Sequence, residues 1–212
     1  RNRDVTRGLN LVIREGLISE AMTTLTGGTF LMAMAILLGA SNFQIGLVAA
    51  LPTMTNIFQM VTTRLLQKYN NRRLITVIAN GFARLPLLVI GALPLLFSAN
   101  TSFATIIFIL VFHYSFGSIA GASWNSWMKD LVPGSKLGSY FSKRTSATQT
   151  LNVFLSLAIA LMLDYVKANH PGYELTTYAL MFIAGGSLGL VGTWLLSRTP
   201  EPVSYLPKGN LF

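Results

Sequence analysis

The chain has 212 residues, of which 52% are hydrophobic and 11% are charged, and it contains no cysteine. Its formal net charge of +9 would suggest a nucleic-acid partner in a soluble protein. The basic residues, however, are gathered in clumps between long apolar stretches, so we expect no nucleic-acid partner. The absence of cysteine excludes a disulfide framework and thiolate metal ligands, and we expect neither a metal nor a cofactor.

Two long stretches of the chain lack charge. Residues 21–63 contain no Asp, Glu, Lys, Arg or His, and residues 85–128 contain only His113. A membrane-spanning helix needs about 20 apolar residues, so each stretch is predicted to hold two spans. Polar turns at Ser41-Asn42 and at residues 98–101 divide them. With two shorter charge-free runs, the sequence predicts an all-α membrane protein whose six helices cover roughly 15–38, 43–66, 74–97, 103–128, 145–166 and 175–197.

The distribution of Lys and Arg predicts the orientation of these helices. Four precede or begin the first helix, four follow the second, four follow the fourth and two follow the sixth, all on one side. The opposite side carries Lys167, and Arg84 lies inside the third helix. Because basic loops stay in the cytoplasm, both termini are predicted to be cytoplasmic. Residues 1–14 then form a cytoplasmic segment, 15–197 the transmembrane domain, and 198–212 the start of a cytoplasmic loop.

Four of the six predicted helices carry polar stripes at helical spacing. The stripes are Glu20, Thr23, Thr24, Gly27 and Gly28 on the first helix; Pro52, Asn56, Gln59 and Thr63 on the second; Ser118, Ala122 and Asn125, flanked by Trp124 and Trp127, on the fourth; and Thr145, Gln149, Asn152 and Ser156 on the fifth. The third and sixth helices lack such a stripe, apart from Arg84. The pattern favours a central aqueous cavity, with helices three and six at the lipid-facing periphery. The alternative is that the polar groups hold helices together.

Small residues on two helices predict close packing. Gly117 and Gly121 lie four residues apart on the fourth helix, and Gly185, Gly189 and Gly192 follow one face of the sixth. This spacing lets helix backbones approach closely in lipid. Ordinary packing within the bundle is the simpler interpretation, and a dimerisation face is the alternative.

Glu20 and Arg84 are the charged residues expected within the spans, because Glu15 and Asp164 are predicted to lie near helix ends. Charged side chains in the bilayer are costly and commonly functional. Glu20 is a candidate proton-coupling or substrate-contacting group, and Arg84 a candidate anion or ion-pair partner. The structural alternative pairs them with each other or with backbone carbonyls. The remaining candidate substrate or coupling residues are Asn56, Gln59, Trp124, Asn125, Gln149 and Asn152.

The basic loops carry a family resemblance. The segment from Thr63 to Arg73 resembles the G-x-L-x-D-R-x-G-R-R signature of the major facilitator superfamily, with Gln67 in place of the acidic residue and Asn71 in place of Gly. Asp130-Leu131-Val132-Pro133 with the following Gly138–Arg144 is similar to the family's second loop motif, and Arg198-Thr199-Pro200-Glu201-Pro202 suits the start of its central loop. The candidate gating residues at the cytoplasmic face are Arg64, Gln67, Lys68, Arg72, Arg73, Asp130 and Arg144.

The resemblance implies a secondary transporter that works by alternating access, ion- or proton-coupled, in which two six-helix halves each contain a 3+3 inverted repeat. In that fold the first, second, fourth and fifth helices line the interface. The chain would be the amino-terminal half, or a half that pairs with a second copy. Its expected partners are a small solute, with H⁺ as a candidate coupling ion, a second half and the lipid bilayer, in a bacterial inner membrane. The sequence does not distinguish a sugar, peptide, drug-like amphiphile or lipid as substrate.

Two other classes of membrane protein are alternatives. Gly121-Ala122-Ser123-Trp124 is similar to the nucleophile motif of six-helix rhomboid proteases. Such a site needs a His on the sixth helix as base, and residues 175–197 contain none. We therefore expect no enzyme. A channel subunit is the remaining alternative, although no selectivity-filter loop or periodic Arg helix is present.

Overall fold

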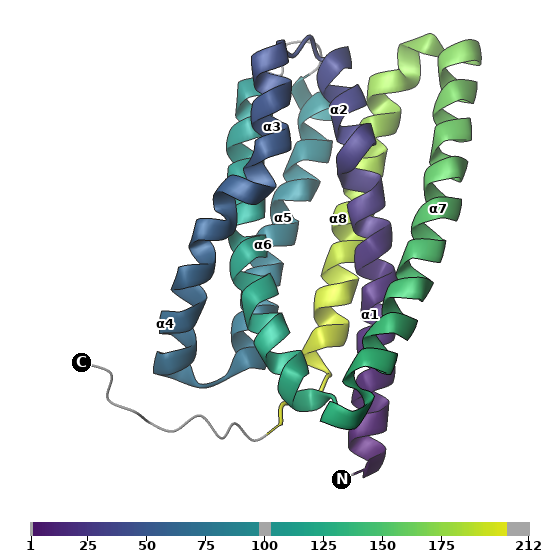
Figure 1. The fold of residues 1–212 in the computed structure, drawn as a ribbon. Helices are drawn as coiled ribbons and strands as arrows, with labels where there is room; N and C mark the ends of the chain where they lie inside the picture. Colours follow the sequence, from purple (N-terminus) through teal and green to yellow (C-terminus); the bar gives the residue numbers. More distant parts are fainter. Residues whose placement is uncertain (1, 98–102, 203–212) are drawn as a thin grey trace.

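The computed structural model describes residues 2–97 and 103–202, with side chains from Arg7 onward except that of Phe97. This part of the chain is an all-α bundle without strands, and it contains six helices long and apolar enough to cross a membrane. The helical segments are α1 (Asn2–Thr26), α2 (Gly28–Leu37), α3 (Asn42–Met54), α4 (Gln59–Tyr69), α5 (Arg72–Phe97), α6 (Phe103–Leu131), α7 (Leu137–Asn169) and α8 (Glu174–Ser197). α1 with α2, and α3 with α4, each form one span (Figure 1).

Two helices begin earlier than the charge pattern indicated. α1 begins at Asn2 and not near residue 15, and α7 begins at Leu137 and not near residue 145. Polar and basic residues continue both helices beyond the apolar stretch, because a helix can extend past the hydrocarbon into water. Glu15 therefore lies in the middle of α1 and not near its end, which corrects the sequence analysis. The predicted turn at 98–101 and residues 203–212 of the predicted 198–212 loop lie outside the described residues.

The first two spans are interrupted, each for a local reason. At the junction of α1 and α2, Gly28, the first residue of α2, has φ of +53°, a left-handed conformation that favours glycine. Between α3 and α4, a 3₁₀ turn at Thr55–Phe58 follows Pro52. The Thr55 hydroxyl there donates to the Leu51 carbonyl at 2.8 Å, which helps to satisfy the backbone near the break. α5 by contrast runs uninterrupted through Pro86 and Pro94.

α5 packs closely against α8, and glycines make this possible. A Cβ atom added at Gly91 of α5 would lie 2.7 Å from the Ala179 carbonyl oxygen, and one at Gly186 of α8 would lie 2.8 Å from Leu88 Cδ2. α8 also packs against α1, where a Cβ at Gly185 would lie 2.4 Å from Thr26 Cγ2. Gly185 and Gly189 are therefore packing residues within this bundle, as predicted for the sixth helix, and Gly186 has the same role.

The predicted packing of Gly117 and Gly121 is wrong. A Cβ atom added at either position meets no atom within 4 Å. These glycines of α6 line an open space, described below, and do not bring two backbones together.

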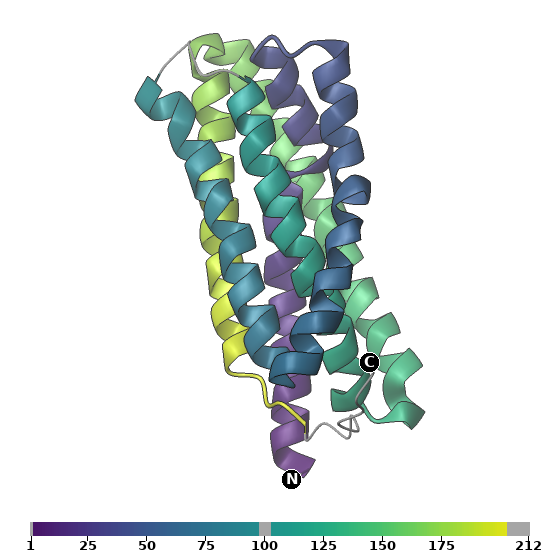
Figure 2. The same cartoon turned by 90° about the vertical axis from the view of Figure 1, so that its left-hand side faces the viewer.

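The helices are arranged in layers, with α5 and α8 on one side of the bundle and α3, α4 and α7 on the other (Figures 1 and 2). We compared the most apolar 18-residue segment of each span. Half of these residues are buried within the bundle for α5 and for α8, compared with 22% for the α3–α4 span and 6% for the α7 span. One side of the bundle is therefore well packed, and the other leaves apolar helix faces exposed.

Candidate functional site

A buried ion pair joins α1 to α5. Arg84 Nη2 lies 3.2 Å from Glu15 Oε1, and each side chain is only 5% exposed. Ser19, one turn after Glu15, donates its hydroxyl to the same carboxylate at 2.5 Å and accepts a hydrogen bond from Arg84 at 2.8 Å. The two charges are thus linked directly and through a shared hydroxyl.

α8 supplies oxygen acceptors to the other side of Arg84. The Arg84 Nη1 group donates to the Thr193 hydroxyl at 2.9 Å and to the Gly189 carbonyl. Gly189 and Gly192 make room for this guanidinium, because added Cβ atoms would lie 3.0 Å from Arg84 Cδ and 2.9 Å from Nη1, respectively. Contacts from α1 and α8 therefore hold Arg84 of α5 in one position.

A second arginine reaches the same carboxylate from α7. Arg144 Nη2 lies 3.4 Å from Glu15 Oε2, and Arg144 Nε donates to the Val12 carbonyl at 3.5 Å. Its guanidinium also stacks on the Trp124 ring of α6, 4.9 Å from the ring centroid. Arg144 was predicted to belong to a cytoplasmic gating network with Asp130, but its contacts place it in this cluster.

These charges border a polar cavity of about 190 Å³ between α1, α5, α6 and α7. Its lining residues are Glu15, Ser19, Asn80, Arg84, Gly117, Ala120, Gly121, Trp124 and Arg144. The expected cavity was to be lined by the first, second, fourth and fifth spans. The third span (α5) takes the place of the second (α3–α4) around this space. The cavity combines ionic groups, an amide and an aromatic ring within the apolar spans, which suits the binding of a polar solute.

Glu20 lies outside this cluster. Its carboxylate accepts a hydrogen bond from the Asn152 amide of α7 at 3.0 Å, and the same amide nitrogen donates to Thr24 at 3.0 Å. Arg84 thus pairs with Glu15 and not with Glu20, and the structure joins two of the predicted residues, Glu20 and Asn152, in a separate contact between α1 and α7.

The other predicted amides lie on the surface of the bundle. Asn56, Gln59, Asn125 and Gln149 are exposed, and Gln59 donates to Asn56 at 3.1 Å within the same span. An amide facing hydrocarbon without a partner would be costly. These positions therefore indicate a face that meets water or another protein surface.

A further ionic contact lies at the end of the bundle where α1 begins and where α4 connects to α5, which we call the basic end (Figure 1). Arg72, the first residue of α5, pairs with Asp130 near the end of α6, and both are among the predicted gating residues. The backbone N–H of Arg72 donates to Glu201 at 2.5 Å, and the Ser123 hydroxyl donates to the Arg72 carbonyl at 3.0 Å. Glu201 places a carboxylate at a helix N-terminus, where negative charge is favoured.

The segment after α8 packs beneath the bundle at the basic end. The Trp127 indole of α6 donates to the Pro200 carbonyl at 3.2 Å, and Thr199 is fully buried. The remaining predicted gating residues are spread over α4 and the start of α5. Arg64, Gln67 and Lys68 are exposed, and Arg73 is partly buried.

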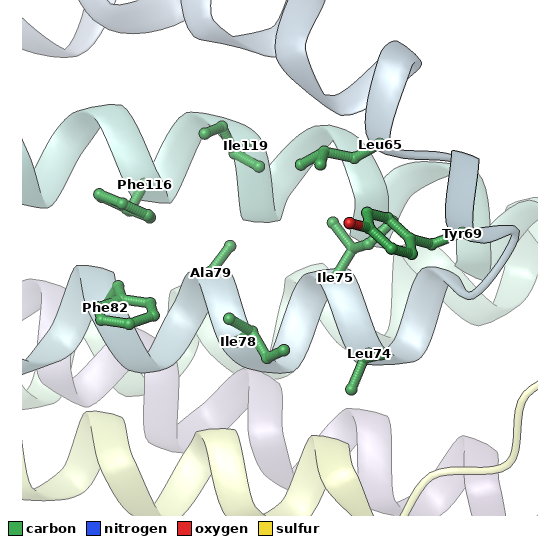
Figure 3. A pocket seen from close by; sticks show the side chains of 9 residues that line it. All are labelled: Leu65, Tyr69, Leu74, Ile75, Ile78, Ala79, Phe82, Phe116 and Ile119. Atoms are coloured by element: carbon green, nitrogen blue, oxygen red, sulfur yellow. The ribbon is translucent and has the colours of Figure 1, made fainter. Parts of the chain in front are cut away.

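An apolar groove of about 350 Å³ lies between α4, α5 and α6 at the basic end (Figure 3). Ile78 and Phe82 of α5 and Ile119 and Phe116 of α6 are among the side chains that line it, and its polar group is the Tyr69 hydroxyl. This lining suits hydrocarbon and offers no charge to hold a polar solute. Of these two spaces, the polar cavity is the one whose lining suits a polar solute, and it is the candidate functional site.

Sequence reasoning missed Glu15, Ser19, Asn80 and Glu201. The first two share the face of α1 that meets Arg84, and their four-residue separation was a usable signal. Asn80 precedes Arg84 by one turn on α5 and forms a short polar stripe with it. Glu201 had no signal of this kind, because its partner lies 129 residues away in the chain.

Comparison with known proteins gives a family match over most of the chain. A family model described as "Major Facilitator Superfamily" matches residues 16–210. No curated protein and no solved structure gives a significant match to the chain.

Proposed function

Because the chain belongs to the major facilitator superfamily, and so is a multi-pass membrane transporter, we propose that it moves a small polar solute by alternating access. The observation that carries this proposal is the polar cavity bordered by Glu15, Arg84 and Arg144. Buried charges in a spanning bundle are expensive and mark solute or ion pathways. Glu15 and Arg84 are buried and Arg144 is partly buried, so the cavity has the polar lining that suits the binding of a polar solute.

The uneven burial of the helices supports the role of this chain as one half of the transporter. The α7 span is almost unburied, and the α3–α4 span is little buried. Exposed amides at Asn56, Gln59 and Gln149 lie on these same spans. We propose that this face meets a second six-helix half, from the same protein or from a second copy, across an aqueous cleft.

The basic end is proposed to face the cytoplasm, in a bacterial inner membrane. It carries the loops rich in Lys and Arg, and such loops are retained on the cytoplasmic side. There the Arg72–Asp130 pair joins the start of α5 to the end of α6. We assign this pair to the gating network, because the contact between Arg72 and Asp130 would form or break as the two ends of the bundle open in turn.

Glu20 is proposed as the coupling residue for H⁺. It is partly buried and its carboxylate contacts Asn152 on α7, so its charge is held between two helices of the less buried side. Protonation of Glu20 would change the Glu20–Asn152 contact, and so could link proton uptake to movement of α7 against α1.

Two experiments test this function. A ligand-stabilisation screen on the purified protein identifies a solute, and proteoliposomes are then assayed for counterflow of that labelled solute. We expect counterflow, and we expect Glu20→Gln to abolish uptake driven by a pH gradient while exchange continues. Single-channel conductance without counterflow would instead identify a channel subunit. Uptake that still follows the pH gradient in Glu20→Gln would move coupling to another residue.

The geometry does not favour the protease alternative. The Ser123 hydroxyl donates to the Arg72 carbonyl at 3.0 Å, and the His113 ring nitrogen lies 2.5 Å from the Ala83 carbonyl. The candidate nucleophile and this histidine therefore have separate backbone partners, and a serine nucleophile needs an adjacent base.

A further inference from the structure

The charges that border the polar cavity do not balance. Two guanidinium groups, of Arg84 and Arg144, share the single carboxylate of Glu15. The other side chains that line the cavity are Ser, Asn, Ala, Trp and Gly, which carry no charge. The cavity lining therefore has one positive charge in excess, in a part of the bundle where charge is costly. An anion that entered the cavity would neutralise it.

The two arginines differ in how firmly they are held. Arg84 is buried and contacts Glu15, Ser19, Thr193 and the Gly189 carbonyl, at 3.2 Å or less. Arg144 has a 20% exposed side chain, and its contacts to Glu15 and to the Val12 carbonyl are longer, at 3.4 and 3.5 Å. Arg144 is therefore the guanidinium that can turn toward a solute, while Arg84 keeps Glu15 in place.

Glycine allows Arg144 to occupy this position. A Cβ atom added at Gly16 of α1 would lie 2.7 Å from Arg144 Nε and 2.8 Å from Cζ. The guanidinium also stacks on the Trp124 ring. Arg144 is thus in contact with both α1 and an aromatic ring, and its side chain borders the cavity. A planar fork of N–H donors matches a carboxylate in two hydrogen bonds.

The excess charge and the volume of the cavity limit which class of anion it can bind. One excess positive charge matches a monoanion, whereas a phosphate monoester carries about −1.5 to −2 at neutral pH and would leave the cavity negative. A volume of about 190 Å³ corresponds to about six water molecules at their liquid volume. That is room for a carboxylate and a few carbon atoms, so the rest of a larger solute would extend out of the cavity. Asn80 of α5 also lines the cavity and carries an amide donor.

We propose that the polar cavity binds the carboxylate of a monocarboxylate solute, with Arg144 as its principal partner and Asn80 as a second donor. This inference rests on the proposed transport function, since it names the chemical class of the solute. It assigns Arg84 a different task, which is to hold the Glu15 carboxylate beside Arg144 without contacting the solute directly.

Binding to the purified protein in nanodiscs tests the site without requiring transport. Calorimetric titrations use benzoate as the probe, with neutral benzamide and inorganic phosphate for comparison. We expect benzoate to bind at least tenfold more tightly than either. Arg144→Gln should weaken benzoate binding at least tenfold. Lys143→Gln removes the same charge from the adjacent, exposed position and should change binding less than twofold.

A second variant separates the position of Arg144 from its charge. Gly16→Ala keeps every charge and adds a methyl group where the guanidinium now lies, so it should also weaken benzoate binding at least fivefold. Size-exclusion profiles and melting temperatures confirm that each variant is folded. Arg144→Lys, which keeps the charge and loses the fork, is used if the Gln variant does not fold, and should lose affinity as well. Benzoate affinity unchanged in Arg144→Gln, or equal affinity for benzoate and benzamide, would overturn the assignment. Tighter binding of phosphate would also overturn it.

Proteoliposome assays distinguish failure of this inference from failure of the transport function. Benzoate binding that depends on Arg144, without counterflow of any carboxylate, would keep the site and contradict its role in transport. Counterflow of a neutral solute that is unchanged in Arg144→Gln would leave the transport function standing and refute the carboxylate site.

Discussion

The buried cluster predicts an unequal response to the loss of each of its charges. Replacing Glu15 with Leu removes the carboxylate that both Arg84 and Arg144 contact, and leaves two guanidinium groups near one another without an anion. Removing one partner of a buried pair costs about 3–5 kcal/mol. Because Arg84 keeps hydrogen bonds to Thr193 and the Gly189 carbonyl, we expect Glu15→Leu to lower the free energy of unfolding by about 3 kcal/mol, the lower end of that range.

Replacing Arg84 with Met should cost less. The Glu15 carboxylate then keeps Arg144 at 3.4 Å and the Ser19 hydroxyl at 2.5 Å, so no charge is left without a partner. The methionine also retains much of the apolar packing against α8. The remaining loss is that of a satisfied hydrogen-bond network, about 1–2 kcal/mol.

Reversible unfolding of the purified protein in mixed detergent micelles, followed by far-UV circular dichroism, measures both values. Lys143→Gln, at an exposed position on α7, provides a control that should stay within about 0.5 kcal/mol of the parent. An Arg84→Met variant that loses as much stability as Glu15→Leu would refute the reasoning, because the carboxylate would then not be shared between two cations.

Three further outcomes follow from the packing and from the basic end. Gly91→Ala places a methyl group 2.7 Å from the Ala179 carbonyl oxygen, and it should destabilise the bundle by about 1–3 kcal/mol. Gly117 has open space beside it, so the melting temperature of the Gly117→Ala variant should be close to that of the parent protein. Asp130→Asn should shift the balance between inward- and outward-open states several-fold in spin-label distance measurements, since a partly solvated pair contributes about 1 kcal/mol; an unchanged distance distribution would remove Asp130 from the gating network. Glu201→Gln weakens the charge-assisted contact at the start of α5 and should speed hydrogen exchange of the Arg72 amide, while exchange in the middle of α5 stays the same.

The sequence alone was sufficient to predict the membrane fold. Uninterrupted apolar runs leave no choice but helices across a bilayer, because backbone N–H and C=O groups must be satisfied within the segment. The number of spans follows from the length of those runs and the thickness of the hydrocarbon. The loop motifs added the family, which the match over residues 16–210 shows. The pairing of Asp130 with a basic residue at the start of α5 could also be predicted from the sequence, because both residues border loops on the same side of the membrane.

The tertiary structure decided which carboxylate of α1 meets Arg84. Glu15 and Glu20 are five residues apart, which on a helix of 3.6 residues per turn places them about 140° apart around the axis. Apolar content does not say which of these faces turns toward α5. The rotation of α1 is set by its contact with α8, where Gly185, Gly189 and Gly192 let the helix approach closely. That contact places Glu15 beside Arg84 and Glu20 beside Asn152. The sequence alone does not reveal this arrangement, because it depends on glycines of α8, which is distant from α1 in the chain.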